Sequence, residues 1–197
     1  MEKIKILALF GKSASGKDNI QKWIVKNCPK INGIVSCTTR PPRSTEQHGV
    51  DYFFLSDEEF AKKVLDGSML EATSFREWFY GTALDQLDPE KINVGVFNIS
   101  GIECLITDPR LQVVPVWIHA NNKTRLIRSL SREQNPDCTE ICRRFFADEE
   151  DFKDIDFEYY GWFNEAEEHQ YYNYRISQLL RILNEFCEPG QNPRNLL

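Results

Sequence analysis

The sequence lacks the features of several protein classes. No apolar run approaches the roughly 18 residues that a membrane span needs, so we expect no membrane partner. Three histidines and six cysteines show no metal-ligand spacing, which leaves no signature of a zinc site. Scattered thiols are typical of reduced proteins, and they predict a cytoplasmic location. No repeat, low-complexity tract or interdomain linker is visible in the chain.

Positive charge is also in short supply. The formal net charge is -6, so binding to nucleic acid would require a tight cluster of basic residues, and we expect no nucleic-acid partner. Hydrophobic residues make up 41% of the chain, which is enough to bury a core. A length of 197 residues fits one domain with a small inserted subdomain.

What the sequence does contain is a glycine-rich loop, GKSASGK, at residues 11–17. An apolar run at residues 3–9 precedes it and indicates a buried first strand rather than a signal peptide. Apolar residues at helical spacing follow it. Strand, G-x-x-x-x-G-K and helix together predict a phosphate-binding loop whose lysine reaches the β- and γ-phosphates. The predicted ATP-binding residues here are Gly11, Ser13, Ala14, Ser15, Gly16, Lys17, Asp18 and Asn19.

Asp18 stands where such loops usually carry a serine or threonine that helps to hold magnesium. A carboxylate is itself a hard oxygen ligand for Mg²⁺. We therefore predict Asp18 as the metal contact and Mg²⁺, bound with ATP, as the cofactor. The alternative is a relic that kept the loop and lost the chemistry.

The pattern of elements predicts an α/β fold. Residues 93–99 and 113–118 have the apolar composition of buried strands, and residues 122–133 have the pattern of a helix capped by Asn121 or Asn122. Strands that alternate with helices favour a mostly parallel sheet with right-handed crossovers. The chain ends with an amphipathic helix predicted at residues 176–186.

The pattern changes between residues 33 and 86. Predicted strands at 51–55 and 69–75 flank a helix, for which Ser56 and Glu59 form a capping box and Gly67 is the stop. We predict a small mixed subdomain inserted after the first helix. The predicted division is a core of residues 1–32, 87–120 and 170–190, a subdomain of residues 33–86, and a lid at about residues 125–147.

Two groups of arginines stand out. Arg40 and Arg43 flank two prolines, which stiffen the segment and hold two guanidinium groups for one phosphate, although a surface turn would look similar. A second group lies on the helices predicted at residues 122–133 and 139–152, which a flexible connection joins. These helices would suit a lid over a triphosphate, and a solvated charged helix pair is the alternative. The second group comprises Arg125, Arg128, Arg132, Arg143 and Arg144.

The order of the phosphate loop, TTRPPR..E..GVDYFFLS..EF and LEATSF...FYGT resembles guanylate kinase over about residues 4–145. This resemblance implies the P-loop kinase fold, with a parallel-sheet core, an inserted monophosphate-binding subdomain and a helical lid. It implies transfer of the γ-phosphoryl group of ATP to GMP or dGMP. It also implies lid and catalytic roles for Arg128, Arg132 and Arg144, besides Lys17 and Arg40, and an adenine contact at Asn173. The implied acceptor site holds the phosphate with Arg40, Arg43, Glu46, Tyr52 and Tyr80, and the base with Ser36, Glu71, Thr82 and Ser100.

The chemistry of the base supports one of these roles independently. A carboxylate such as Glu71 can accept hydrogen bonds from two adjacent N–H groups, which guanine offers and adenine does not. However, Asn98 and Ser100 stand where the family has two aspartates. This departure keeps open a kinase for another nucleoside monophosphate, and a non-catalytic binding module is the second alternative. The acidic and aromatic stretch 148–174 would suit a protein partner, although half-buried helix faces explain it as well.

Overall fold

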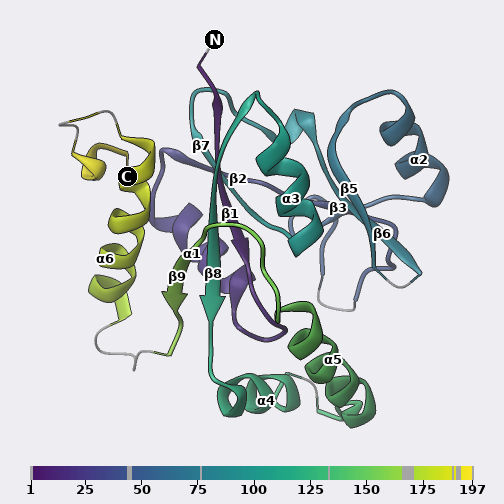
Figure 1. Cartoon of the computed structure of the whole chain (residues 1–197). Helices are drawn as coiled ribbons and strands as arrows, with labels where there is room; N and C mark the ends of the chain where they lie inside the picture. Colours follow the sequence, from purple (N-terminus) through teal and green to yellow (C-terminus); the bar gives the residue numbers. More distant parts are fainter. Residues whose placement is uncertain are drawn as a thin grey trace.

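Two β-sheets lying side by side organise the chain (Figure 1). The computed structural model describes residues 2–43, 46–75, 77–132, 134–165, 171–187, 189 and 192–196. The larger sheet has five parallel strands in the order β2-β7-β1-β8-β9. These strands are β1 (Ile4–Phe10), β2 (Ile31–Gly33), β7 (Ile92–Val96), β8 (Leu111–His119) and β9 (Tyr160–Phe163).

Helices cover both faces of this sheet, as a parallel sheet requires. Helices α1 (Lys17–Asn27) and α6 (Tyr171–Leu183) pack on one face, and α3 (Ile99–Thr107) packs on the other with the segment 152–157. Their apolar residues form two clusters, centred on fully buried side chains such as Leu9 and Ile6. The predicted α/β fold with a parallel core is therefore confirmed.

The smaller sheet has the order β4-β3-β6-β5 and mixes parallel with antiparallel pairs. Helix α2 (Asp57–Leu65) packs on it through Phe60. The capping box of Ser56 and Glu59 is formed, and Gly67 follows the helix with a φ of +75°. Both helix signals are thus confirmed. The strands are β3 (Cys37–Thr38), β4 (Phe53–Phe54), β5 (Met69–Phe75) and β6 (Trp78–Ala83), and a 3₁₀ turn, Leu84–Gln86, follows β6.

Helices α4 (Asn122–Leu130) and α5 (Cys138–Asp151) follow β8 and lie together at one end of the larger sheet (Figure 1). Asn121 caps α4, which settles the choice that the sequence left open. Within the described residues, no helix has the length and hydropathy of a transmembrane segment. Two 3₁₀ turns, Asn184–Phe186 and Pro193–Leu196, follow α6.

Several predicted boundaries were wrong. The strand predicted at 93–99 ends at Val96, because Asn98 turns the chain and caps α3. The strand predicted at 51–55 is reduced to β4, and the helix predicted at 122–133 ends at Leu130, while Glu133 lies outside the described residues. The terminal helix begins at Tyr171 instead of residue 176. The predicted core ranges also leave out β9, a strand of only four residues.

Candidate functional site

An open cleft of about 1780 Å³ lies where the phosphate loop, the segment 43–52 between β3 and β4 of the smaller sheet, and the α4–α5 pair face one another. A smaller hollow of about 380 Å³ lies between Arg40, Tyr80 and Arg144. The main cleft is larger than a typical pocket for one small ligand, so it has room for two. It brings together Ser13, Ala14, Gly16, Lys17, Asp18, Asn19, Arg43, Glu46, Tyr52, Arg128, Arg132 and Arg144 from the predicted site.

The N-terminus of α1 opens into this cleft. Helices α2 to α5 each have an N-cap side chain that accepts a hydrogen bond from the first turn, whereas α1 begins at Gly16 without one. The first N–H groups of a helix have no partner within it, and the helix dipole adds positive potential there. This end of α1 can therefore bind an anion such as a phosphate group.

The two glycines of the loop are required by their neighbours. A Cβ at Gly11 would lie 2.5 Å from the carbonyl oxygen of Ile118, in the backbone of β8. A Cβ at Gly16 would lie 2.4 Å from Nδ2 of Asn164, and Gly16 also has a φ of +94°. Any other residue would push the loop away from the sheet or strain it.

Lys17 is held inside the loop. Its Nζ donates to the carbonyl oxygens of Gly11 (2.7 Å) and Lys12 (3.2 Å). Burial lowers the pKa of this amine. Both bonds go to neutral acceptors, so a phosphate oxygen entering the loop would offer the ammonium group a stronger, charged partner.

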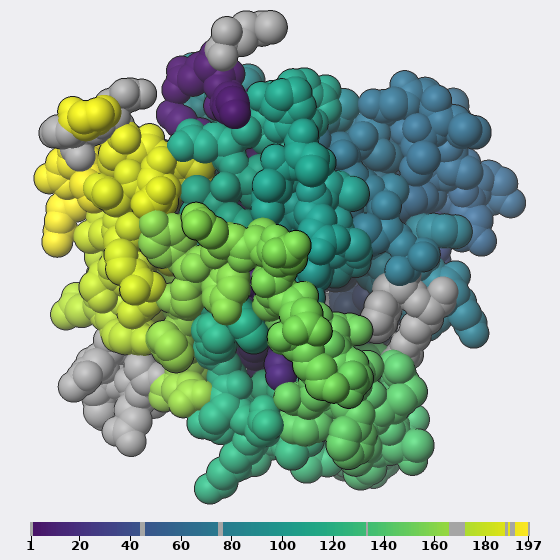
Figure 2. All heavy atoms as spheres, in the orientation of Figure 1, coloured from purple at the N-terminus to yellow at the C-terminus, as the bar shows by residue number. Residues whose placement is uncertain are grey.

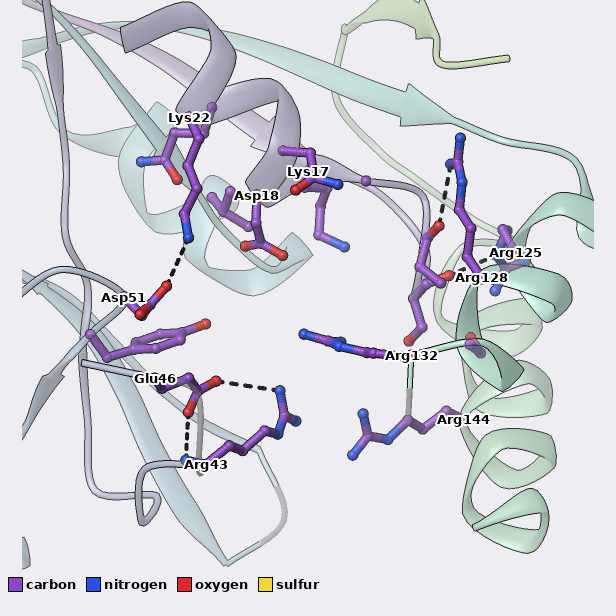
Figure 3. Close-up of a pocket in the computed structure, with 18 of the residues that line it drawn as sticks. Lys17, Asp18, Lys22, Arg43, Glu46, Asp51, Arg125, Arg128, Arg132 and Arg144 are labelled. Atoms are coloured by element: carbon purple, nitrogen blue, oxygen red, sulfur yellow. Dashed lines mark hydrogen bonds and ion pairs between the residues drawn. The ribbon is translucent and has the colours of Figure 1, made fainter. Parts of the chain in front are cut away.

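Asp18 lies beside Lys17 and faces the cleft (Figure 3). Tyr52 lies on the opposite side of the cleft, and its pKa is raised to about 12. The main cause is burial of the hydroxyl, and the negative charge of Asp18 is the next. The Tyr52 hydroxyl therefore stays protonated and can donate a hydrogen bond at neutral pH.

On the side of the smaller sheet, Glu46 binds Arg40 and Arg43, the two arginines that the sequence predicted to hold one phosphate. Its carboxylate accepts two hydrogen bonds from Arg40, at 2.9 and 2.8 Å, and one from the backbone N–H of Arg43 at 2.8 Å. Burial opposes ionisation, but these bonds hold the pKa of Glu46 below its usual value. Arg40 is only 8% exposed, whereas Arg43 extends toward the cleft, where partial burial and then the charge of Arg40 lower its pKa.

Glu71 and Thr82 form a separate polar pair on β5 and β6. Thr82 donates to the Glu71 carboxylate at 2.9 Å, and burial raises the pKa of Glu71 to about 7. A Cβ at Gly101 would lie 3.3 Å from the other carboxylate oxygen, so the start of α3 borders this pair. Ser36 precedes Cys37, which pairs with Gly81 next to Thr82.

Asn98 and Ser100 are exposed at the same end of α3. The Asn98 oxygen accepts from the N–H of Gly101 at 2.7 Å, and its amide nitrogen donates to Thr73 at 2.9 Å. Both ends of this amide are therefore engaged within the protein.

The arginines of α4 and α5 differ in their surroundings. Arg128 donates to the carbonyl oxygens of Ser15 (3.2 Å) and Asn164 (3.0 Å), so it contacts the loop itself. Arg132 and Arg144 extend into the space that Arg43 enters from the other side (Figure 3). Arg144 is held at 2.6 Å by Glu140. Arg132 lies between Lys17 and Arg43 (Figure 3), and after burial its charge helps to lower the pKa of both groups.

Comparison with known proteins agrees with this geometry. The sequence model of the family described as guanylate kinase matches residues 3–169. The chain belongs to the guanylate kinase family. The resemblance expected from the sequence is thus confirmed, and it covers more of the chain than the expected residues 4–145.

Individual relatives support the same assignment. A guanylate kinase from Rhodopirellula baltica is 33% identical over 134 residues, which are 64% of each chain. One from Campylobacter jejuni is 28% identical over 193 residues and spans 95% of this chain and 92% of its own. The crystal structure of guanylate kinase from Anaplasma phagocytophilum has a TM-score of 0.63 at 20% identity and covers 98% of this chain and 90% of its own, which supports the P-loop kinase fold.

Asn164 contacts the loop of this guanylate kinase family member, although the sequence did not predict it as a site residue. Asn164 follows β9, is only 5% exposed and donates to the Ser15 carbonyl oxygen at 2.8 Å. Asn173, the predicted adenine contact, is exposed on α6 and does not line the cleft formed by the described residues. The signal for Asn164 was a polar residue directly after an apolar pair, but the strand before it was too short to recognise.

The residues at the loop fit a magnesium ion that arrives with a nucleotide. The described residues contain no group of three or more acidic, histidine or cysteine side chains that could hold a metal alone. Mg²⁺ prefers one or two carboxylates together with phosphate oxygens and water. Asp18, exposed beside the open end of α1, supplies such a carboxylate.

The raised pKa of Glu71 predicts a pH-dependent stability. A carboxyl group with a pKa near 4.3 when unfolded and about 7 when folded stabilises the protein below about pH 4.3, and this contribution is lost as the pH rises through 7. Glu71→Gln stays neutral, so its melting temperature should rise relative to the parent between pH 5 and pH 8. Thermal melts across this range test it, with exposed Glu103→Gln as control. A difference that is constant with pH would contradict the raised pKa.

Proposed function

We propose that the chain transfers the γ-phosphoryl group of ATP to GMP or dGMP, giving ADP and GDP or dGDP. The observation that carries this proposal is the cleft, which sets the uncapped end of α1 and Lys17 opposite Arg43, with Arg132 and Arg144 between them. Membership of the guanylate kinase family supports it. Phosphoryl transfer needs little besides positioning and charge neutralisation, and the cleft supplies groups for both.

On the donor side, the open N–H groups of α1 would bind the β-phosphate of ATP, and Lys17 would leave its carbonyl partners for the β- and γ-phosphates. Asp18 would hold Mg²⁺, which supplies charge neutralisation at the phosphates when bound. Arg132 and Arg144 would stabilise the charge that develops on the transferring group. Arg128 is bound to the loop carbonyls, so we assign it to holding the loop rather than the phosphate.

On the acceptor side, Arg43, Tyr52 and Tyr80 would bind the phosphate of the monophosphate. Arg40 would do so after a change of partners, because Glu46 now occupies it. This arrangement keeps Arg40 in place before the substrate arrives. The acceptor oxygen would then lie in line with the γ-phosphate of ATP. Holding both nucleotides in one complex turns a bimolecular reaction into an effectively unimolecular one.

Base recognition would rest on Glu71, Thr82 and Ser36. The ionised Glu71 carboxylate can accept from the two adjacent N–H groups of guanine, and the Thr82 hydroxyl already orients it. Asn98 carries an amide where the family has a carboxylate, and both ends of this amide are already bonded within the protein. This observation favours a wider choice of acceptor as the second candidate.

We also propose a cytoplasmic setting, with nucleotides as the ligands. All six cysteines are free thiols, which is usual in a reducing compartment. An intact loop with a lysine at its end argues against a module that only binds, since such a module needs no group for a γ-phosphate.

The acceptor test decides the proposed reaction. With ATP and magnesium, kcat/KM for GMP or dGMP should exceed that for AMP, CMP and UMP by at least about tenfold, because the wrong base leaves buried polar groups unpaired at about 1–3 kcal/mol each. A coupled assay of ADP release with each monophosphate measures this. Equal turnover of AMP would support the wider choice instead, and no turnover with any monophosphate would support the binding module.

Arg43→Ala should impair the acceptor side selectively. Loss of a charged hydrogen-bonding partner should lower kcat/KM for GMP, by an amount that corresponds to about 2–4 kcal/mol of lost transition-state stabilisation. The affinity for ATP should barely change. Arg43 is a cleaner probe than Arg40, because removing the buried Arg40 would leave Glu46 without its main partner. Arg110→Ala, an exposed arginine paired with Asp108 outside the cleft, is the control. Weaker ATP binding with intact GMP kinetics would reverse the two phosphate sites.

Asp18→Ser tests the metal contact. Without a metal, a carboxylate beside a triphosphate is repulsive by about 1 kcal/mol, so in chelator the variant should bind ATP about fivefold more tightly than the parent. With excess magnesium the two should be nearly equal, because either side chain offers an oxygen ligand. Calorimetric titrations under both conditions measure this, with Asp57→Ser at the start of α2 as control. Equal affinities in chelator would mean that Asp18 does not face the phosphates.

A further inference from the structure

A buried arginine on α4 makes contacts that the proposed reaction does not use. Arg125 is 2% exposed, and the ring of Phe145 lies 4.8 Å beneath its guanidinium carbon. Its Nε donates to the carbonyl oxygen of Ser13 at 3.0 Å, and its Nη2 pairs with Asp148. A buried charge of this kind is costly unless it is fully paired, so its partners are of interest.

The main partner, Asp148 on α5, binds the same loop residue. Its carboxylate accepts from the backbone N–H of Ser13 at 2.8 Å and from the Ser13 hydroxyl at 3.1 Å. Arg125 and Asp148 thus engage the N–H, the carbonyl and the hydroxyl group of Ser13. A second bond runs parallel, because Lys12 pairs with Glu149 at 2.7 Å.

These contacts join the phosphate loop to two consecutive helices that lie more than 100 residues further along the chain. In Figure 2, purple atoms from the N-terminal part of the chain are visible between the teal and green atoms of the region that contains α4 and α5. Arg125 and Asp148 lie at the two ends of the stretch that carries Arg128, Arg132 and Arg144. The pair therefore fixes the base of the proposed lid to the phosphate loop and leaves the tip, around residues 134–137, beyond the attachment.

We propose that Arg125 and Asp148 are positioning residues, which set the lid arginines at a fixed distance from the phosphate loop and transmit nucleotide binding from the loop to the lid. This rests on the proposed phosphoryl transfer. Arg125 borders the cleft, but its three guanidinium nitrogens already donate to protein partners, and the loop N–H of Ser13 is already taken by Asp148, so the donors for phosphate begin after Ser13. Because a misplacement of about 1 Å can cost about 100-fold in rate, a fixed attachment matters for Arg132 and Arg144.

The test separates positioning from stability. Asp148→Ala leaves the buried Arg125 with Glu149 as its remaining acidic partner, and Arg125→Leu leaves Asp148 without its cation, so each should lower the melting temperature. The double variant replaces the pair by apolar groups and should recover most of it. The double variant should nevertheless bind ATP at least about tenfold more weakly and show a kcat at least tenfold lower, with the KM for GMP unchanged. Asp151→Ala, exposed on the same helix, is the control. A double variant with parental melting temperature, ATP affinity and kcat would overturn the proposal.

Asp148→Asn decides the matter if the double variant does not fold. It keeps the size of the side chain and one acceptor, but loses the charge that Arg125 and Ser13 share. It should fold and lose kcat and ATP affinity in the same direction; parental values would overturn the proposal.

Hydrogen exchange makes the result independent of the acceptor reaction. In either variant, peptides of α4 and α5 should exchange faster than in the parent without any nucleotide present, and ATP should protect them less. If the parent phosphorylates no monophosphate, the proposed function fails while this measurement still tests the attachment. Unchanged exchange in α4 and α5 would contradict it.

Discussion

The left-handed backbone at Gly16 starts α1 without a side-chain cap, and the rest of the cleft is arranged around the N–H groups that this leaves open. The loop stands at the carboxyl end of β1, between β7 and β8, where the strand order of the sheet reverses. Parallel α/β sheets bind ligands at this point because the chain leaves neighbouring strands in opposite directions. The sheet topology therefore determines where the anion site lies, and the positive potential at the N-terminus of α1 determines that it binds anions.

Three of the cations at the cleft already have partners within the protein. Glu46 holds Arg40, Glu140 holds Arg144, and backbone carbonyl groups hold Lys17. A cluster of unpaired charges would repel itself and lower the stability of the fold. Binding of phosphates would therefore exchange internal partners for substrate oxygens, which keeps the side chains oriented before binding. Arginines therefore face the N-terminus of α1 from two sides, one group from the smaller sheet's side and one from the α4–α5 pair.

The sequence predicted the parts of this arrangement that depend on local patterns. The loop, the capping box at Ser56 and the two helices after β8 follow from spacing and residue type, and the structure has them. It did not predict β9, whose four residues include Gly161 and carry almost no period. For the same reason Asn164 was missed, and Asn173 was chosen from a weak match.

Long-range pairing was the other limit. Arg125 and Asp148 were visible only as charged residues on helices, because nothing in the spacing of charges shows that both meet Ser13 across more than 100 residues. Asn98 was placed inside a strand, since an apolar run hides a cap until the following helix is recognised. Tertiary contacts, rather than propensity, decided these positions.

The two loop glycines show that the signature G-x-x-x-x-G-K is not a self-contained module. Gly11 is required because a Cβ there would meet the backbone of β8, whereas Gly16 is required by its own φ of +94°, and a Cβ there would also displace the side chain of Asn164. The two glycines of the motif therefore reflect the positions of β8 and of Asn164 as well as the ligand that the loop binds. Grafted onto another scaffold, these seven residues would lack the strand backbone that makes Gly11 necessary and the Asn164 side chain that is bonded to the loop.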